Sequence, residues 1–518
     1  MERYKCGIPA IDLGTTNSLA AYFDEISKKG EPCEDCDGSN LLPSAVSFEK
    51  NSDNVVVGKN AKDEAKIYPD RTALRFKRKM GKTKEAMKVD GRSVSPQELS
   101  AYILKRLKQN LEALLEENVN KVVITVPAYF SNDAREATKE AARMSGMEVA
   151  GLIDEPVAAL YHYDVLNSLQ GKYVLVVDLG GGTLDIALVK ITKNEINELI
   201  INGSTELGGS DFDEMFMKYL KKKYLAGKVQ MIDEEQDLLL NVEKAKIGLS
   251  NRDSVRITAS SESGRELFVV TRAEFEQATK PLMKEMERIL DEVLGEIKKQ
   301  KIKVDSVLMV GGATRMKQVE ALIKSKFPSA NILAKDRDEA VVRGAAVYAK
   351  KIAQNQVCHV VKTIKTNTAD NNIKELKKIT SRSYGTDIMD SEQRKMKIMN
   401  MIPKGSKIPV TVEKTFKTLH DNQKTVPFNV YEYFSNDGMI DLDNKYLVAK
   451  CSLMLNGNYP KGTAVKGKMW IDEDGTIHMK GELKGDSVVE IRVEKKALLS
   501  DEEIRDTKKR LDEVNIIC

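Results

Sequence analysis

The sequence predicts an α/β protein that continues into a mostly β part and ends in a short helix. Three observations predict this class. Apolar, strand-like runs alternate with segments of helical pattern over the first two-thirds of the chain. After residue 378 short alternating segments follow one another, separated by Asn-Gly and Asp-Gly turn signals. A helix start signal then lies close to the end of the chain. The first pattern is typical of a sheet covered by helices, and the second is typical of an antiparallel sandwich.

The first part should contain strands that are buried on both faces, because several runs are apolar and β-branched throughout. The expected strands are residues 121–126, 173–177 and 307–310. Helices are expected between them, over residues 95–116, 133–145 and 211–224. The first of these helices opens with Ser95-Pro96-Gln97-Glu98, which places a proline and a carboxylate in the first turn, as helix starts commonly do.

The composition of the chain changes near Gln354, and together with the later patterns this change suggests four units. We expect an α/β unit over residues 1–354, a polar linker over 355–378, a β-sandwich over 379–497 and a short helical piece over 498–518. The expected strands of the sandwich are residues 410–416, 427–433, 467–471 and 488–493. Ser500-Asp501-Glu502-Glu503 forms a capping-box pattern, which predicts the final helix.

Composition and charge exclude several classes of protein. The 518 residues carry 82 Lys and Arg against 78 Asp and Glu, a formal net charge of +4, whereas nucleic-acid binders concentrate a basic excess. The sequence has no uninterrupted apolar stretch long enough to predict a membrane span. The first residues have no apolar core of a signal peptide. Only six cysteines occur, so we expect a reducing, cytoplasmic location.

One motif occurs twice, and it suits phosphate binding. In each copy an Asp ends an apolar run, and Gly and Thr form a tight turn after it: Asp12-Leu13-Gly14-Thr15-Thr16, and Asp178-Leu179 followed by Gly180, Gly181, Gly182, Thr183, Leu184 and Asp185. Glycine lets backbone N–H groups approach phosphate oxygens, threonine adds hydroxyl donors, and the Asp can hold Mg²⁺ or its waters. Either copy alone is equally consistent with an ordinary glycine-rich hairpin. Two copies favour two related lobes that face one nucleotide. A third glycine-rich turn, Gly311-Gly312-Ala313-Thr314-Arg315, again follows an apolar run.

Together with further motifs, these residues resemble the DnaK-type 70-kDa heat-shock chaperone family. The further motifs are Val126-Pro127-Ala128-Tyr129-Phe130, Ile153-Asp154-Glu155-Pro156-Val157-Ala158-Ala159, Leu207-Gly208-Gly209-Ser210-Asp211-Phe212-Asp213 and Asp338-Glu339-Ala340 before Gly344-Ala345-Ala346. The resemblance runs in order from about residue 10 to 349, and more loosely to about 504. The short stretch between Lys77 and Ser95 resembles the compact bacterial members.

The resemblance implies an actin-like, two-lobed ATPase domain that binds ATP or ADP with Mg²⁺, with K⁺ as a further candidate cation. By motif position, the catalytic residues would be Lys77, Glu155, Asp178 and Thr183, with Glu155 positioning the attacking water. The nucleotide contacts would be Asp12, Gly14, Thr15, Thr16, Gly180, Gly181, Gly182, Asp185, Gly208, Gly209, Glu243, Lys246, Ser250, Gly311, Gly312, Arg315 and Asp338. Asp12 and Asp178 would be the metal ligands. Pro127 and Arg135 match positions that relay the nucleotide state to the other domain.

The family also implies that the sandwich binds extended apolar peptides, with Met389, Leu419, Val426 and Phe428 lining the pocket. From alternation alone, the same four residues fit plain sandwich core equally well. Three departures from the family pattern stand out. Ile247 replaces the usual Arg beside adenine. The linker text Ile373-Lys374-Glu375-Leu376-Lys377-Lys378-Ile379 is charged, so we expect it to dock poorly on an apolar groove. The helical lid is short, so we expect fast peptide release.

The sequence therefore predicts an ATP-dependent protein-folding chaperone of the stress-response type. Its expected partners are unfolded or extended apolar peptides, a J-domain co-chaperone and a nucleotide-exchange factor, with no nucleic acid and no membrane. Two alternatives remain at this point. One is a phosphotransferase for a small acceptor on the same fold, against which the β-rich C-terminal part argues. The other is an ATP-sensing adaptor with a dedicated protein partner, which the altered linker and short lid favour.

Overall fold

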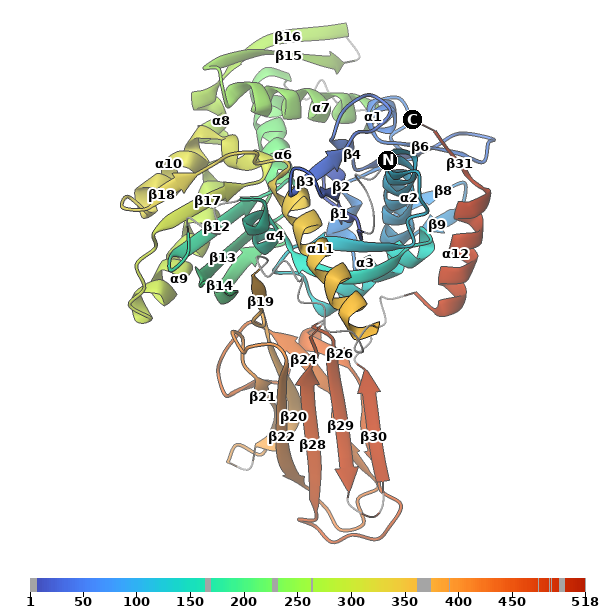
Figure 1. Ribbon diagram of the computed structural model, residues 1–518, viewed down its shortest axis with the longest axis vertical. Coiled ribbons are helices and arrows are strands. Elements are labelled where there is room, and N and C mark those ends of the chain that lie inside the picture. Colours follow the sequence, from blue (N-terminus) through green and yellow to red (C-terminus); the bar gives the residue numbers. More distant parts are fainter. Residues whose placement is uncertain are drawn as a thin grey trace.

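The computed structural model describes residues 7–163, 169–225, 232–261, 264–360, 374–390, 392–473, 475–483, 485, 487–492 and 499–517. The expected linker over residues 361–373 and the expected sandwich end at 493–497 lie outside these described residues. Figure 1 shows an upper α/β part, built from the first 360 residues, and a β-rich part below it. No helix of the described residues is long and apolar enough to cross a bilayer.

The α/β part is built on two sheets with the same strand order. The first runs β11-β10-β1-β2-β3 and the second β18-β17-β12-β13-β14, and in both the central strand pairs parallel with the strand before it in this order and antiparallel with the strand after it. The strands of the first are β1 (Ala10–Asp12), β2 (Asn17–Asp24), β3 (Lys29–Cys33), β10 (Lys121–Val126) and β11 (Glu148–Asp154). Those of the second are β12 (Tyr173–Leu179), β13 (Leu184–Ile191), β14 (Glu195–Ser204), β17 (Ser306–Val310) and β18 (Asn331–Leu333). The repeated motif therefore reflects two structurally related lobes.

Helices cover both sheets. They include α2 (Pro96–Leu115), α3 (Asn132–Met144), α4 (Glu155–His162), α6 (Gly209–Leu220), α7 (Ile232–Leu249), α9 (Lys280–Lys299), α10 (Lys317–Lys326) and α11 (Ala340–Val360). Ser95 caps α2 as predicted, because its side chain accepts a hydrogen bond from the Glu98 N–H. α11 continues to Val360, so its last six residues extend into the segment expected to be linker. The expected helix from residue 211 begins two residues earlier, and it gives way after Leu220 to a short π-helical turn over 221–225.

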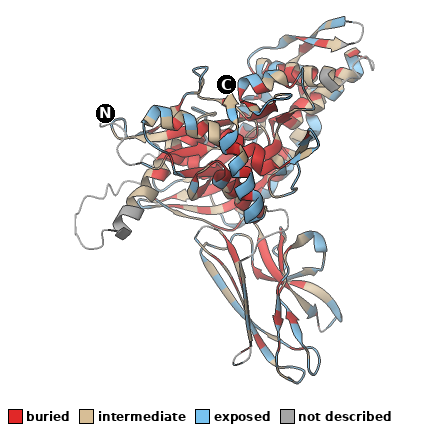
Figure 2. Ribbon diagram, turned by 90° about the vertical axis from the view of Figure 1, so that its right-hand side faces the viewer, coloured by how far each residue is buried: buried red, intermediate tan, exposed pale blue. Residues whose placement is uncertain are grey.

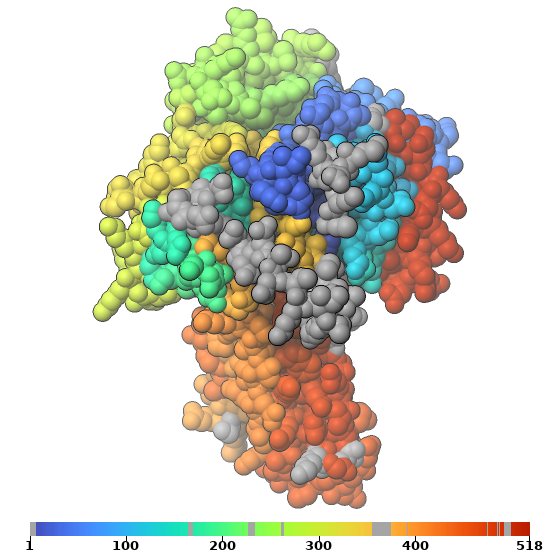
Figure 3. Space-filling model, in the orientation of Figure 1, coloured from blue at the N-terminus to red at the C-terminus, as the bar shows by residue number. Residues whose placement is uncertain are grey.

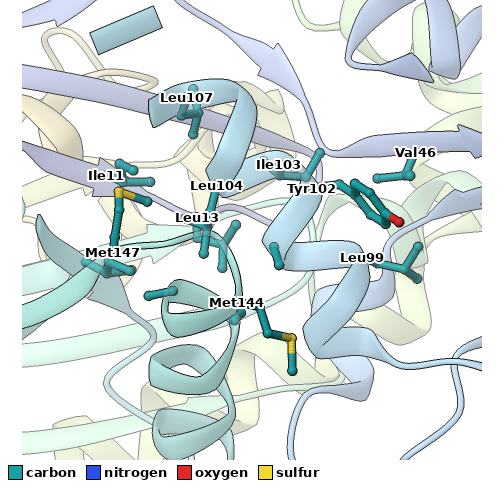
Figure 4. Packing of buried hydrophobic residues seen from close by; sticks show 14 of the residues in the cluster. Ile11, Leu13, Val46, Leu99, Tyr102, Ile103, Leu104, Leu107, Met144 and Met147 are labelled. Carbon is teal, nitrogen blue, oxygen red and sulfur yellow. The ribbon is translucent and has the colours of Figure 1, made fainter. Parts of the chain in front are cut away.

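Separate apolar clusters hold the α/β part together. Figure 4 shows one of them, in which Ile11 and Leu13 from the first lobe pack with Leu104 of α2 and Met144 and Met147 at the end of α3. A second cluster fills the other lobe beneath α6, α7 and α9. A third joins the two lobes through α4 and α11. Figure 2 shows that buried residues dominate the interior of the α/β part, while the β-rich part has a thinner core.

The β-rich part is a sandwich of two antiparallel sheets. One sheet runs β25-β21-β20-β24-β26 and the other β22-β28-β29-β30. Their strands are β20 (Ser383–Asp390), β21 (Lys395–Ile402), β24 (Val430–Tyr433), β25 (Met439–Asp441), β26 (Leu447–Ala449), β22 (Val410–Lys417), β28 (Ala464–Ile471), β29 (Ile477–Leu483) and β30 (Ser487–Arg492). A small pair, β23 (Thr425–Pro427) and β27 (Ser452–Met454), closes one side. The predicted mixed α/β and sandwich classes are thus confirmed.

The last helix, α12 (Asp501–Glu513), has the predicted capping box between Ser500 and Glu503. It does not lie over the sandwich. Its buried residues Ile504 and Leu511 join the core cluster of α2 and α3, and Figure 3 shows the red C-terminal segment against the blue N-terminal one. After it, β31 (Asn515–Ile517) pairs in parallel with β6 (Asn54–Val57). In this arrangement the segment expected to act as a lid belongs to the surface of the α/β part.

Candidate functional site

The two copies of the Asp-Gly-Thr motif meet face to face between the lobes. Glycine has no Cβ atom. If Gly181 carried one, it would lie 1.9 Å from Oγ1 of Thr16, and a Cβ on Gly182 would lie 2.4 Å from Oγ1 of Thr15; both distances are too short for a real contact. Only glycine allows two loops to approach this closely. Gly208 supports the second loop from behind, because a Cβ there would lie 2.5 Å from the carbonyl carbon of Gly182. The internal repeat therefore places both turns around one point.

These turns open onto a cleft of about 620 Å³. Most of the sequence-predicted nucleotide residues line it: Asp12, Gly14, Thr15, Thr16, Lys77, Glu155, Asp178, Gly180, Gly181, Gly182, Thr183, Gly311, Gly312 and Asp338. The remaining predicted residues lie beside this cleft or behind it, as described below.

The third glycine turn closes another side of the cleft. Gly311 has φ of 79°, and a Cβ there would lie 2.5 Å from Oδ1 of Asp178. A non-glycine residue would be strained at this φ and would also collide with the Asp178 carboxyl group. On the outer rim, Nη2 of Arg315 lies 2.6 Å from Oδ2 of Asp338. The two residues predicted on this side therefore form an ion pair with each other.

One buried ion pair spans the cleft between segments far apart in the sequence. Nζ of Lys77 donates to Oε1 of Glu155 at 2.8 Å, and both side chains are almost fully buried. Lys77 lies in the short 3₁₀ helix Phe76–Lys79, and Glu155 is the first residue of α4. The Lys77 ammonium group also lies 5.4 Å from the centre of the Phe130 ring. Two contacts therefore fix the position of the Lys77 ammonium group.

Three of the carboxyl groups that line the cleft, those of Asp12, Glu155 and Asp178, have a pKa that burial raises. The pKa of Glu155 rises to about 8 because burial and the charges of Asp12 and Asp185 outweigh the attraction of Lys77. Burial and the neighbouring Glu155 and Asp185 charges hold the pKa of Asp178 well above its usual range. The pKa of Asp12 is also raised by burial, although its Oδ1 accepts from Thr125 at 2.6 Å.

This excess of carboxylates fits a divalent cation. Lys77 is the one cation that appears among the causes of the shifts at Asp12, Glu155 and Asp178. A bound Mg²⁺ would relieve the mutual repulsion, and carboxylate oxygens are the ligands that it prefers. Among the residues that the structure describes, no ready-made cluster of three metal-ligating side chains occurs. That agrees with the usual Mg²⁺ site, which relies on one or two carboxylates, waters and substrate phosphates.

The residues predicted on the adenosine side lie on α7. Glu243 forms an ion pair with Lys62 across the cleft at 2.7 Å, and this pair borders a second hollow of about 400 Å³ that also touches Thr15 and Thr16. Nζ of Lys246 donates to Oδ2 of Asp213 and to the Gly209 carbonyl oxygen, both at 2.8 Å. The hydroxyl group of Ser250 donates to the Lys246 carbonyl oxygen. Ile247 is 60% exposed, so an apolar face is available at the position of the family's Arg.

Two contributors to the site were missed by the sequence reasoning. Arg78 donates to the Gly182 carbonyl oxygen at 2.7 Å and pairs with Asp211, so it braces the second phosphate loop from the opposite lobe. The backbone N–H of Tyr129 donates to Oδ1 of Asp185 at 3.0 Å. Asp185 is therefore turned toward Tyr129 and is fully buried. The basic run around Lys77 was the only sequence signal for Arg78, and no side-chain pattern could reveal a backbone donor.

Tyr129 connects this site with the β-rich part. Its ring stacks on Phe434 with centroids 5.0 Å apart, and its carbonyl oxygen accepts from Nη2 of Arg382 at 3.1 Å. The predicted relay residue Arg135 lies nearby and donates to Oδ1 of Asp154 at 2.7 Å. Pro127 accepts a turn hydrogen bond from the Phe130 N–H at 3.1 Å. The contact between the two parts therefore lies close to two carboxyl groups of the site. Tyr129 is bonded to Asp185, and Arg135 is bonded to Asp154, which directly precedes Glu155.

The charged linker docks, contrary to the expectation from its sequence. We call residues 374–379 the connector. Its β19 (Glu375–Lys377) pairs in parallel with β14, which extends the second sheet. Lys374 is only 4% exposed, and its Nζ donates to the carbonyl oxygens of Thr192 and Lys193 at 2.7 and 2.6 Å. The expectation was wrong because backbone pairing and lysine-to-carbonyl bonds add to the apolar contacts of Leu376 and Ile379.

The four residues predicted to line a peptide pocket are placed differently from one another. Met389 and Leu419 are 39% and 38% exposed, and Val426 is buried. Phe428 is fully buried; its ring lies against Phe416, and a Cβ at Gly467 or Gly481 would collide with it. Phe428 is therefore part of the sandwich core and not a surface contact, which corrects its assignment. Met389 and Leu419 remain accessible to a ligand.

Comparisons with known proteins agree with this geometry. The model of the Hsp70 protein family matches residues 8–515. The chaperone protein DnaK of Thermotoga petrophila is 32% identical over 491 residues, which cover 92% of this chain and 78% of that protein. The chaperone protein DnaK of Thermosipho melanesiensis is 32% identical over 490 residues, with the same coverage.

Proposed function

Since the chain belongs to the Hsp70 family, and is thus an ATP-dependent chaperone with ATPase activity, we propose that the cleft between its lobes is where it binds and hydrolyses ATP. The observation that carries this proposal is the convergence of three glycine turns and the carboxyl groups of Asp12, Glu155 and Asp178 on one cleft. Phosphoryl transfer depends mainly on positioning and charge stabilisation. The cleft offers both.

The phosphates would lie against the turns at Thr15–Thr16 and Gly180–Thr183. Backbone N–H groups and threonine hydroxyls of these turns would donate to the phosphate oxygens. Lys77 would stabilise the charge that develops on the γ-phosphate, and Glu155 would orient the attacking water. Arg78 would hold the Gly180–Thr183 turn in place through the Gly182 carbonyl group and Asp211.

Asp12 and Asp178 would hold Mg²⁺, directly or through waters. The ion, when bound, would neutralise phosphate charge. These two carboxyl groups suit it because both are buried and both repel their carboxylate neighbours. The adenosine moiety would contact Glu243, Lys246, Ser250 and Arg315, with Ile247 packing against the base. K⁺ stays a further candidate cation.

We also propose how the chain is divided in function. Residues 1–354 would form the ATPase unit, and residues 379–497 would bind extended apolar segments of unfolded proteins, with Met389 and Leu419 as exposed contacts. Pro127 and Arg135 would relay the nucleotide state. A J-domain co-chaperone and a nucleotide-exchange factor would act on the chain in the cytoplasm. The dedicated adaptor is not proposed, because the linker that favoured it docks on the α/β part.

Single-turnover ATP hydrolysis tests the proposal, measured with and without a short apolar peptide. We expect hydrolysis by the wild-type protein and acceleration by the peptide, with Glu155→Ala as the blank. Hydrolysis that survives in the blank would contradict the cleft assignment. Hydrolysis that does not respond to the peptide would contradict the coupling of the two parts and leave the ATPase assignment intact.

A further inference from the structure

The connector contacts a buried carboxyl group that the sequence motifs do not include. β19 pairs with β14 from Glu195 opposite Glu375 to Asn197 opposite Lys377. The next residue of β14 is Glu198, which is 3% exposed. Its Oε2 accepts a hydrogen bond from the backbone N–H of Ile379 at 3.0 Å. Glu198 therefore holds the connector where it leaves the sheet and turns toward the β-rich part.

The surroundings of Glu198 compensate a negative charge only in part, because burial and Asp154 outweigh the attraction of Arg135 and Lys378. Oε1 of Glu198 is buried and has no hydrogen-bond partner among the described residues. The facing ionisable groups are Asp154 of β11, Arg135 of α3, Tyr161 of α4 and Lys378 of the connector.

The cations among these groups are engaged elsewhere. Arg135 bonds to Asp154, and Lys378 donates to the Leu152 carbonyl oxygen at 3.1 Å. The partner of Glu198 on β13 is the apolar Val189. On α9, which also packs on β14, the acid Glu292 is bonded to Asn202 instead. No charged group is thus committed to Glu198.

We propose that Glu198 is a positioning residue that fastens the docked connector in its protonated form, so that docking takes up a proton. The proposal rests on the proposed function, because it deepens how the β-rich part is coupled to ATP hydrolysis. The protonated carboxyl group still accepts from the Ile379 N–H through one oxygen. It avoids burying a charge beside Asp154, which such a site would strongly disfavour.

The sign of the pH dependence follows from this geometry. Burial and the Asp154 charge raise the pKa of Glu198 to about 8 when the connector is docked. When the connector leaves, water reaches the carboxyl group and its pKa returns toward the ordinary value of about 4.3. Because the pKa of Glu198 is higher in the docked state, the proton stabilises docking at low pH. This stabilisation is lost as the pH rises from about 4.3 to about 8. Between these two values, docking weakens by roughly tenfold for each pH unit.

The position of Glu198 gives this docking a consequence at the cleft. Asp154 faces Glu198 and is bonded to Arg135. Asp154 is also directly followed by Glu155, which would orient the attacking water. A change in the charge of Glu198 acts on Asp154, and thus on the strand end that sets Glu155. Glu198 would act through these neighbours and touch no substrate.

Hydrogen–deuterium exchange of the connector tests the proposal on the full chain with ATP and Mg²⁺. Exchange of the Ile379 amide, corrected for the intrinsic effect of pH, reports docking directly. We expect protection to fall by roughly tenfold from pH 6.5 to 7.5 in the wild type. Glu198→Gln, which is neutral at any pH, should keep its protection throughout. Glu195→Gln on the same strand is the matched control and should retain the wild-type pH dependence.

Two outcomes would overturn the proposal: wild-type protection that does not change with pH, or a Glu198→Gln variant that keeps the wild-type slope. Thermal melting and basal ATP turnover show whether each variant is folded. Should Glu198→Gln fail to fold, the pH profile of peptide-stimulated hydrolysis in Glu198→Asp replaces it, and an unchanged profile would count against the proposal. A protein that hydrolyses no ATP at all would instead contradict the proposed function.

Discussion

At the scale of residues, the Lys77–Glu155 ion pair is the most constrained feature of the cleft. Both side chains are buried, and their charged atoms are 2.8 Å apart. The two residues come from different elements: Lys77 lies in the 3₁₀ helix Phe76–Lys79, and Glu155 begins α4. A single substitution at either residue leaves the other charge buried without its partner, which is far more costly than the pair itself is stabilising.

Glu155→Gln should separate binding from hydrolysis. The amide keeps the shape of the side chain but orients the attacking water poorly, so we expect single-turnover hydrolysis to fall by about 10² to 10³-fold. ATP affinity, measured by calorimetry, should change little. Glu148→Gln, at the exposed start of the same strand β11, should leave both unchanged. Equal losses of affinity and hydrolysis would contradict the role of Glu155.

The pH dependence of hydrolysis provides a second test of Glu155. In the proposed role its active form is the carboxylate, and its pKa in the ligand-free cleft is raised to about 8. Below that pH the residue is mostly protonated, so kcat/KM for ATP should rise with pH and level off above it, because kcat/KM reports the free enzyme. The profile of Glu155→Gln should lack this rise. A wild-type kcat/KM that falls between pH 6 and 8 would contradict the assignment.

Residue identity was predictable where a motif carries it. The glycine and threonine turns reach the cleft, because the duplicated motif specifies backbone approach and hydroxyl donors together. Lys77 also reaches it, but only the family resemblance pointed to this residue. Arg78 and Glu198 were not predictable. Their partners Asp211 and Ile379 are 133 and 181 positions away in the sequence, so the sequence carries no local pattern for either contact.

At the scale of elements, the site depends on how closely the glycine turns pack. Gly208 precedes α6 and touches the backbone of Gly181 and Gly182. The start of α6 therefore supports the Gly180–Thr183 turn directly. A side chain at this position would act on the turn rather than on the helix.

Gly208→Ala should consequently weaken nucleotide binding. Its Cβ would lie 2.5 to 2.7 Å from backbone atoms of the turn, and backbone cannot yield as a flexible side chain does. We expect at least a tenfold loss of ATP affinity in a calorimetric titration, with helical content unchanged by circular dichroism. Gly295→Ala lies in α9 with open space around it and should raise stability by about 0.5 to 1 kcal/mol. Unchanged affinity in Gly208→Ala would contradict the role of the turn.

The capping box predicted α12 correctly, but its location could not be predicted. Its apolar stripe of Ile504 and Leu511 fits any apolar surface of similar width. The structure resolves the choice through contacts with the α/β part, among them the ion pair of Arg510 with the buried Glu98. The partner surface of an amphipathic helix is decided by tertiary packing, and no residue of the helix encodes it alone.

Leu511→Ala tests this location of α12. The side chain is fully buried among α2 and α3, so its truncation should cost about 2 to 4 kcal/mol of unfolding free energy of the α/β part. Denaturant unfolding followed through that part measures the loss. Lys509→Ala, on the exposed face of α12, is the control. Faster peptide release with no loss of stability would place the helix over the sandwich instead.

At the scale of the whole molecule, the α/β part and the β-rich part meet through few side chains. The Arg382 guanidinium group lies 4.3 Å from the centre of the Phe434 ring, and Tyr129 stacks on the same ring. Tyr129, Arg382 and Phe434 line a hollow between the two parts that is open to solvent, so the interface is not continuously packed. Such interfaces allow the two parts to separate. The sequence predicted the two parts and their order, whereas the aromatic cluster joins residues from separate motifs and could not be predicted.

Arg382→Ala should therefore uncouple the two parts without disabling either. It removes the cation–π contacts with Phe434 and Tyr129 and the hydrogen bond to the Tyr129 carbonyl oxygen, a loss of about 1 to 2 kcal/mol in the docked state. Within the sandwich it also removes the ion pair with the buried Glu432, so a thermal melt must show that the sandwich stays folded. We expect peptide stimulation of single-turnover hydrolysis to fall by roughly five- to thirtyfold, while basal hydrolysis stays within about twofold of wild type. Lys395→Ala, exposed on β21, should keep full stimulation. Because Tyr129 also donates to Asp185, a parallel loss of basal hydrolysis would mean that the cluster supports the cleft itself and not its communication with the sandwich.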